Sequence, residues 1–464
     1  VHAIEYYGTK SNEVTTCDES FLLRVGQDDS NLFHATDDMG NIYVTGSFTG
    51  TATIGENSYD SMGGTDVFII KYDSCGNALW SIVGGSTDDD APSDITIQNS
   101  LAAYISLNFR NTFTISGINS TSYSTSSSGG RDGLLLKISD LGEIEWGVSV
   151  KGGSVGEAMQ KVFSGSNTDI FAIASIGGCC PSYSTAVLDG PVNSRTLSKI
   201  GYATGVVIKI LSSGEIVWDA RIGNRDAGFS DVFSDEQNVY ITGGFRSWSN
   251  GTPATFVDGK GSSYSVANPG IGVSYLLKMN QEGEHLWNVS IGNNGSGSNS
   301  ATNVSRIRKS GNDLWISGNS FSGDVIFNST DGNSMSLPGT TESVGFVGTY
   351  AEDGVVTSAQ NYIYQDQKIA MQAFELFDEQ AVLAGSKEVG SFDNSVISWF
   401  DLEMNEQKNK EFQSDGDHYI NDISLEENMY RVSGKYQDGL LVDDFVLDGS
   451  GSFLMQISES PSLV

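Results

Sequence analysis

Residues 37–48 and 65–85 read DDMGNIYVTGSF and TDVFIIKYDSCGNALWSIVGG, and they decide the fold that the sequence predicts. Their apolar runs have the length of β-strands, and turns rich in Gly, Asn and Asp separate them. No stretch of the chain shows a sustained 3.6-residue apolar period, which argues against long helices. The pattern predicts antiparallel strands joined by tight turns.

The pattern returns along the chain at intervals of roughly 70 residues. Each of four copies has a turn Gly and then a Trp four positions later: Gly76 and Trp80, Gly142 and Trp146, Gly214 and Trp218, Gly283 and Trp287. The apolar strand before each turn ends in Lys: Lys71, Lys137, Lys209 and Lys278. A further strand upstream ends in a small residue, as in NIYVTG. Repeats of this length are typical of four-stranded propeller blades, whose strands we name A to D in chain order.

Seven B strands, each followed by a C strand, predict an all-β fold: a seven-bladed β-propeller of four-stranded antiparallel blades. The prediction is a single domain over residues 1–464. Within it, residues 1–20 form an N-terminal extension or clasp, residues 21–459 the seven blades, and residues 460–464 a tail.

The last blade has no D strand of its own, because only a short tail follows its C strand. An unpaired edge strand invites aggregation, so we expect the N-terminal strand to complete this blade and close the ring. Phe21–Arg24 resembles a C strand and residues 4–9, IEYYGT, resemble a D strand. Either could be the clasp, and the spare one could pair with a neighbouring molecule.

The motifs D-x-x-G-N-I-Y-V-T-G, G-G-T-D-V-F-I-I-K-Y-D and G-N-x-L-W resemble the bacterial-type β-propeller repeat abbreviated SBBP. The resemblance covers nearly the whole chain and is closest in blade one. It implies a propeller in a secreted or surface protein, often a large multidomain one, and it carries no catalytic residues to transfer.

The formal net charge is −33, from 58 acidic and 25 basic residues. Nucleic acid and anionic membrane surfaces would be repelled, so neither is an expected partner. No run of 18 apolar residues occurs, and we expect no membrane insertion. The chain starts at Val1 without a signal peptide, which suggests a trimmed, secreted or surface-exposed product.

Cysteines and glycosylation sequons fit an extracellular location. We predict a disulfide between Cys17 and Cys75, with a vicinal or intermolecular arrangement of Cys179 and Cys180. The Asn-x-Ser/Thr acceptors are Asn119, Asn250, Asn288, Asn294, Asn303 and Asn328.

Asp88, Asp89 and Asp90 form an acidic run in the loop after blade one. Closely spaced carboxylates suit Ca²⁺, and this is the one cofactor that the sequence suggests. The run lacks an EF-hand pattern, so a solvated acidic turn is the competing interpretation. The histidines, among them His34, His285 and His418, are too scattered in the repeat to predict a metal or general-base cluster.

The B-to-C segments of blades two to five are long and polar, and long loops carry function more often than scaffold does. Aromatic residues on the B-to-C segments of blades one to four could stack on sugar rings or be fixed packing positions: Tyr59, Tyr123, Tyr183, Tyr264 and Trp248. Trp248 fits the repeat least.

The sequence therefore favours a non-catalytic, extracellular structural or adhesive propeller whose partners are other subunits of a surface assembly. A glycan-binding lectin is the first alternative, and it would use the B-to-C face. A polysaccharide-active enzyme is the second, and it would need paired carboxylates or a Tyr/His base that no motif places.

Overall fold

The computed structural model describes residues 6–7, 21–24, 32–55, 57–153, 156–165, 167–177, 185–246, 251–270, 272–293, 301–321, 323–339, 343–364, 367–377, 380–389, 392–412, 417–426, 429–442, 445–447 and 450–458. The chain divides into two compact units. Unit 1 comprises Val1–Ser127, Leu136–Trp146 and Gln372–Val464, and unit 2 comprises Ser128–Leu135 and Gly147–Met371.

Blade one shows how the repeat folds. It contains β3 (Phe33–Thr36), β4 (Ile42–Phe48), β7 (Asp66–Tyr72) and β8 (Ala78–Gly85), each antiparallel to the next. Almost every residue of β4 and β7 is buried, which explains why both are continuous apolar runs rather than alternating ones. A Cβ at Gly46 would overlap the side chains of Phe68 and Leu32. The Gly that ends this B strand is therefore a packing requirement.

Meanders of the same strand order follow along the chain. Blade two contains β9 (Ala91–Gln98), β10 (Ala102–Phe109), β13 (Asp132–Ser139) and β14 (Ile144–Lys151). Blade three contains β15 (Glu157–Ser164), β16 (Ile170–Ile176), β19 (Ala203–Ile210) and β20 (Ile216–Asn224). Blade four contains β21 (Gly228–Ser234), β22 (Asn238–Arg246), β25 (Gly272–Asn280) and β26 (His285–Asn293). Blade five contains β27 (Ala301–Ser310), β28 (Asp313–Phe321), β31 (Ser343–Ala351) and β32 (Val356–Asn361). Blade six contains β35 (Ala370–Phe377), β36 (Gln380–Val389), β37 (Phe392–Asp401) and β38 (Glu406–Glu411).

The all-β propeller fold is confirmed, but the predicted number of blades is not, because the described residues do not show seven separate blades. Complete meanders of consecutive strands lie in five sheets, because blades four and five share one ten-stranded sheet. The two are joined where Gly272 of β25 pairs in parallel with Ala301 of β27. Neither residue carries a bulky side chain, so the two backbones can approach closely enough to pair.

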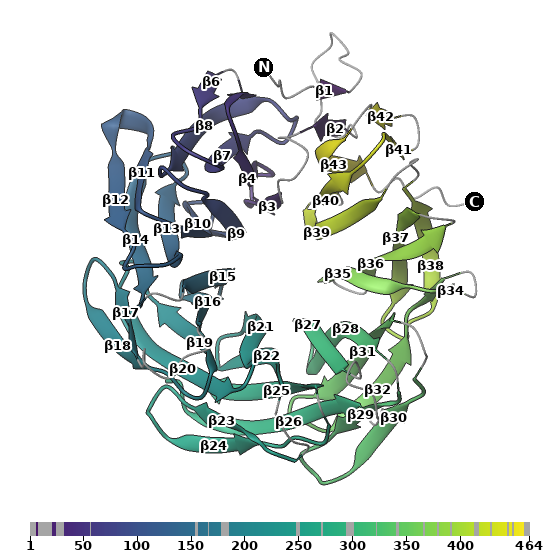
Figure 1. Cartoon of the computed structure of the whole chain (residues 1–464). Coiled ribbons are helices and arrows are strands. Elements are labelled where there is room, and N and C mark those ends of the chain that lie inside the picture. The colour runs from purple at the N-terminus through teal and green to yellow at the C-terminus, as the bar shows by residue number, and fades with distance from the viewer. Residues whose placement is uncertain are drawn as a thin grey trace. The chain divides into compact units, whose positions relative to one another are not determined.

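A composite sheet joins the two ends of the chain within unit 1. It contains β39 (His418–Glu426), β40 (Met429–Tyr436), β43 (Gly451–Ser458), β2 (Phe21–Arg24) and β1 (Tyr6–Tyr7), in that order (Figure 1). Leu23 of β2 lies opposite Leu454 of β43. Of the two candidate clasps, β2 therefore contacts the last C strand directly, and β1 lies outside it.

The long B-to-C segments form hairpins rather than open loops. They are β5 (Thr51–Ile54) with β6 (Asn57–Asp60), β11 (Thr112–Ser116) with β12 (Ser122–Ser126), β17 (Thr185–Asp189) with β18 (Ser194–Ser198), β23 (Ala254–Val257) with β24 (Ser263–Val266), and β29 (Val325–Asn328) with β30 (Ser334–Leu337). β11, β17, β23 and β29 pair with the D strand of the preceding blade: β8, β14, β20 and β26, respectively. The backbone of these segments extends the neighbouring sheet, and their functional role stays a prediction.

The remaining elements are short: η1 (Ile118–Ser120), β33 (Ile363–Tyr364), β34 (Gln367–Lys368), β41 (Leu440–Val442) and β42 (Phe445–Leu447). Within the described ranges, no helix has the length and hydropathy that a membrane-spanning helix requires.

Candidate functional site

Three of the four repeated Lys and Trp pairs attach one blade to the next, whereas Lys137 forms an ion pair with Glu145 of its own blade. In unit 1, Lys71 Nζ and Trp80 Nε1 both donate to the Asp140 carbonyl, at 3.3 and 2.9 Å. Lys71 and Trp80 lie opposite each other, and a bulge follows at Leu79, whose side chain points to solvent. The Lys and the Trp therefore bind a single acceptor in the C-to-D turn of the next blade.

The same arrangement recurs in unit 2. Lys209 and Trp218 donate to the Gln281 carbonyl at 3.1 and 3.0 Å. Lys278 and Trp287 donate to the Glu352 carbonyl at 3.2 and 3.3 Å. In each case the acceptor is a backbone oxygen, which any residue could supply. These residues therefore form part of the scaffold rather than a ligand site.

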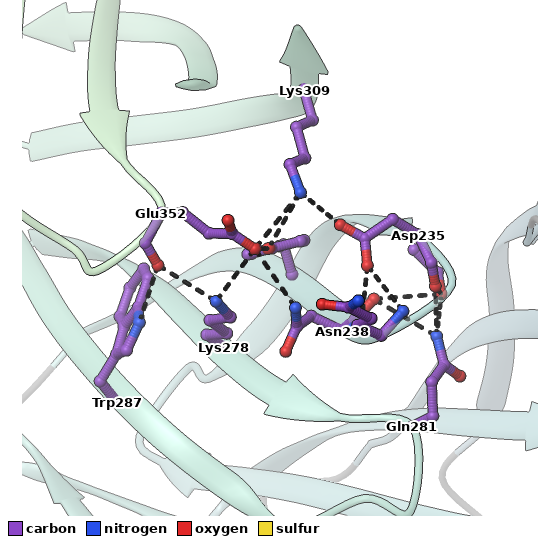
Figure 2. A network of polar contacts seen from close by, with 10 residues as sticks. Asp235, Asn238, Lys278, Gln281, Trp287, Lys309 and Glu352 are labelled. Carbon is purple, nitrogen blue, oxygen red and sulfur yellow. Dashed lines mark hydrogen bonds and ion pairs between the residues drawn. The ribbon is translucent and has the colours of Figure 1, made fainter. Parts of the chain in front are cut away.

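A polar network surrounds Glu352 between blades four and five (Figure 2). Its Oε1 accepts hydrogen bonds from Tyr240 at 2.7 Å and Lys309 at 3.3 Å, and it pairs with Lys278 at 3.3 Å. Lys309 also binds Asp235. The hydrogen bond from Tyr240 lowers the pKa of Glu352, while burial raises the pKa of Tyr240. The positive charges of two lysines neutralise the negative charges of two carboxylates in this network. The network therefore links blade four to blade five.

The described histidines lie in separate places. His34 is buried between Ser433 and Ser424, at 3.0 and 2.9 Å, and burial lowers its pKa. His285 stacks on Tyr264 with ring centroids 4.1 Å apart. Burial lowers the pKa of His418 to about 4, so its ring is neutral at pH 7. Among the described residues, no three His, Cys, Asp or Glu side chains come close enough to hold a metal ion.

The carboxylates of the acidic run after blade one accept hydrogen bonds from backbone N–H groups. Asp90 is buried and accepts the N–H groups of Ser86 and Arg110, at 2.5 and 3.2 Å. Asp89 accepts the N–H of Thr65 at 3.0 Å, and Asp88 accepts the N–H of Asp89 at 3.0 Å. Each carboxylate thus stabilises a different part of the turn. The Ca²⁺ site stays a prediction, and calorimetry with millimolar Ca²⁺ would disprove it by showing neither heat nor a shift in melting temperature.

Paired carboxyl groups do occur, at positions that no motif indicated. Asp132, which begins strand C of blade two, forms a side-chain hydrogen bond with Glu157, which begins strand A of blade three. One oxygen of each, Oδ1 and Oε2, is buried without a hydrogen-bond donor among the described residues. Two neighbouring acceptors are satisfied only when they share a proton. Burial raises the pKa of Asp132 and raises that of Glu157 to about 7.

This pair cannot serve glycoside hydrolysis as it stands. Asp132 is 0 % and Glu157 3 % exposed, so no substrate can reach either carboxyl group. Blade one has a related pair, Asp66 and Asp90, both equally buried. A Cβ at Gly85 would overlap the Asp66 carboxylate, and one at Gly152 would overlap Glu157. The Gly-Gly that ends strand D therefore makes room for these carboxyl groups.

The tyrosines of the B-to-C segments lie on the hairpins. Tyr59 is half-buried and donates to the Ser81 carbonyl of its own blade at 2.8 Å. Tyr264 is half-buried against His285 of its own blade. Tyr123 is half-buried on β12. Tyr59 and Tyr264 thus contact their own blade, and a ligand-binding role of these tyrosines stays a prediction. Tyr183 and Trp248 lie outside the described residues.

Cys75 is disulfide-bonded, and the other three cysteines lie outside the described residues. Of the sequons, Asn119 and Asn303 are exposed, and Asn288 is half-buried. The Asn328 amide donates to Ser290 at 3.0 Å, so this amide is already engaged. Asn250 and Asn294 lie outside the described residues.

A pocket of about 560 Å³ opens in unit 2 on the loop face, defined as the side on which strands A and C begin. Four of the lining residues have little or no side chain and so leave room in the pocket: Gly228, Gly244, Gly272 and Ala301. The charged Asp226 and Arg246 and the polar Asn303 also line it. Phe321 is 42 % exposed beside them. Its volume is that of a small-ligand site, and only missing side-chain bulk could have indicated it in the sequence.

No protein-family model and no curated protein matches the chain. Solved structures that resemble it include the Dos1 propeller, with TM-score 0.44 and 10 % identity over 94 % of this chain and 93 % of that one. A subtype N10 neuraminidase-like protein of A/little yellow-shouldered bat/Guatemala/060/2010 has TM-score 0.34 and 9 % identity over 94 % and 98 %. The extracellular domain of the one-component system BT4673 from B. thetaiotaomicron has TM-score 0.21 and 8 % identity over 98 % and 75 %. At these TM-scores the likenesses carry no argument about function.

Proposed function

We propose that the protein is a non-catalytic, extracellular structural or adhesive propeller that assembles with other protein subunits. The four single meanders, the two that share a sheet and the composite sheet would be seven blades of one SBBP-type ring, with β2 closing it. The disulfide at Cys75 supports an oxidising, extracellular location.

One observation carries this proposal: the recurring polar residues are used to hold blades together. Lys71 and Trp80 bind one carbonyl, Asp132 and Glu157 bind each other, and Glu352 is neutralised by lysines. The polar residues named in this paragraph, which could serve catalysis in another protein, are thus either buried or paired. A chain built in this way supplies rigid surface rather than reactive groups.

Assembly is tested by sedimentation velocity of the oxidised chain over a hundredfold range of concentration. We expect the weight-average mass to rise with concentration. A monodisperse monomer at the highest concentration would contradict the assembly part of the proposal. Reducing-sugar release from a panel of polysaccharides tests the non-catalytic part, and turnover above background would contradict it.

The loop-face pocket supports a second candidate function, glycan binding. An exposed Phe beside an Arg, an Asp and an Asn combines a stacking surface with hydrogen-bonding groups, as sugar sites require. A Cβ at Gly228 would meet no atom within 4 Å. The side chain introduced by Gly228→Leu should therefore enter the pocket without its Cβ clashing with a neighbour. Thr255→Leu adds the same side chain on an exposed strand position away from the pocket.

A glycan array discriminates between these variants. Specific binding that is lost in Gly228→Leu and in Trp248→Ala, but kept in Thr255→Leu, would establish a lectin. Equal binding by all variants, or by none, would rule out this pocket as the glycan site.

A further inference from the structure

The outer edge of strand D is a defined position in this fold. In blades one to four this edge pairs with the hairpin from the next blade, as between Ile115 of β11 and Gly84 of β8. Equivalent pairs join β17 to β14, β23 to β20, and β29 to β26. Each of these contacts pairs only two or three residues on each strand. A short strand beside strand D is therefore the normal covering of a blade edge.

In the composite sheet, β2 takes the position of strand D, and β1 covers its outer edge. Tyr6 lies opposite Leu23, and Tyr7 opposite Leu22. By the rule of the other blades, this edge belongs to the B-to-C hairpin of blade one, β5 and β6. That hairpin instead forms a two-stranded sheet of its own among the described residues.

The hairpin shares a hydrophobic core with the strand next to β2. Ala52 and Ile54 of β5 are buried in one cluster with Leu454 of β43, the residue opposite Leu23. One edge thus has two candidate strands in one chain: β1 pairs with it, and β5 would cover it by the rule of the other blades. Because β1 pairs only two residues, as many as β11 does, neither strand has a clear advantage in paired length.

We propose that β1 is an exchangeable strand, donated to the edge of β2 in a second copy of this chain. This inference rests on the proposed assembly function and names its contact. When β1 leaves, β5 can cover the vacated edge, so no bare strand is exposed to water or to other proteins. Residues 8–20 join β1 to β2, and an extended link of that length spans up to roughly 45 Å, enough to reach a neighbour.

The donated strand would make the same backbone pairs between copies as within one copy. Reciprocal exchange between two copies closes a dimer, whereas one-way donation extends into a fibre. Main-chain hydrogen bonds supply the contact, so it depends on the backbone N–H of β1 that faces β2 rather than on net charge.

The test compares two double variants of the oxidised chain. Tyr6→Pro with Tyr7→Pro removes the backbone donors of β1, and Tyr6→Ala with Tyr7→Ala keeps them. In sedimentation velocity we expect the Ala variant to assemble as the parent does and the Pro variant to associate at least tenfold more weakly. We also expect a synthetic peptide of residues 1–12 to bind the Pro variant in calorimetry, and the same peptide with both prolines not to bind.

Three outcomes of these experiments would overturn the strand-exchange proposal. If the parent and the Pro variant assemble equally, strand exchange is wrong while the proposed assembly stands on another interface. If the peptide binds but the parent is monomeric at all concentrations, β1 serves only its own chain. A Pro variant that is unfolded by circular dichroism and fails to recover with added peptide would also overturn the proposal, because β1 would then be an obligatory part of the fold.

Discussion

Individual polar residues in this protein act mainly across blade boundaries. Trp218 is almost fully buried, and its one polar atom bonds the Gln281 carbonyl that Lys209 also uses. The Trp of the repeat could be predicted as structural from the sequence, but its partner could not. That partner is a backbone atom some 60 residues further on, which leaves no trace in residue identity.

Replacing Trp218 with Phe should lower the free energy of unfolding by about 1 to 3 kcal/mol, because a buried hydrogen bond and part of the ring volume are lost. The adjacent Val217 is the matched control, since its side chain is 40 % exposed. Val217→Ala should stay within about 0.5 kcal/mol. Urea denaturation monitors both variants, and equal losses would show that the indole contributes nothing specific.

Glu157 should make stability depend on pH. Its pKa is about 7 in the folded chain, against about 4.3 for an ordinary Glu. A carboxyl group with a raised folded-state pKa stabilises fully below its unfolded pKa, and this stability is lost as pH rises through the folded one. We therefore expect the melting temperature to fall between pH 4.5 and 7 through this group.

Glu157→Gln tests that expectation, because the amide stays neutral and can donate to Asp132 at any pH. The variant should melt a few degrees above the parent at pH 8 and with it at pH 5. A parent and variant that differ equally at both pH values would show that the pair does not share a proton.

At the scale of the strand, the apolar B and C runs were predictable and the hairpins were not. Strands such as β7 are buried on every residue, and a continuous run of Val, Phe and Ile indicates this directly. The hairpin strands read TFTIS and SYSTS, and their Ser and Thr residues resemble a polar loop. Their pairing partner belongs to the preceding blade, which a local pattern cannot indicate.

Thr255 in β23 lies between Gly223 of β20 and Ser265 of β24. An internal strand needs every backbone donor, so Thr255→Pro should cost about 3 kcal/mol or more. Thr255→Ala keeps the donor and changes only an exposed side chain, so it should be nearly neutral. Thermal unfolding of the two variants provides the comparison. If the Pro variant melts with the Ala variant, the hairpin is not part of the cooperative sheet.

At the scale of the whole chain, the first and last segments share one sheet. The pairing of β2 with β43 could be anticipated because the last blade lacks a D strand, but the number of separate sheets could not. Blades four and five share one sheet because the backbone of Gly272 pairs with that of Ala301. Residue types alone do not specify this pairing. The loop-face pocket and the carboxyl pairs were missed for the same reason: both arise from packing between distant segments.

Leu23→Pro should therefore destabilise the whole of unit 1, because β2 lies between two strands and needs its backbone donors. We expect faster proteolysis of both the N-terminal and the C-terminal parts of unit 1. Leu23→Ile, which keeps the backbone donor, is the control. Cleavage confined to residues before β3 would show that β2 is dispensable to the composite sheet.

The hairpins that blades two to five lend to their predecessors also bear on how the chain is made. When synthesis has reached Gly85, β8 is complete but its outer edge is bare, and it stays bare until β11 and β12 have emerged as far as Ser126. While these repeats are being synthesised, the growing chain thus carries one unpaired strand edge behind the point of synthesis. Secretion as an unfolded chain, or a chaperone that binds strand edges, would protect that edge until the next repeat arrives.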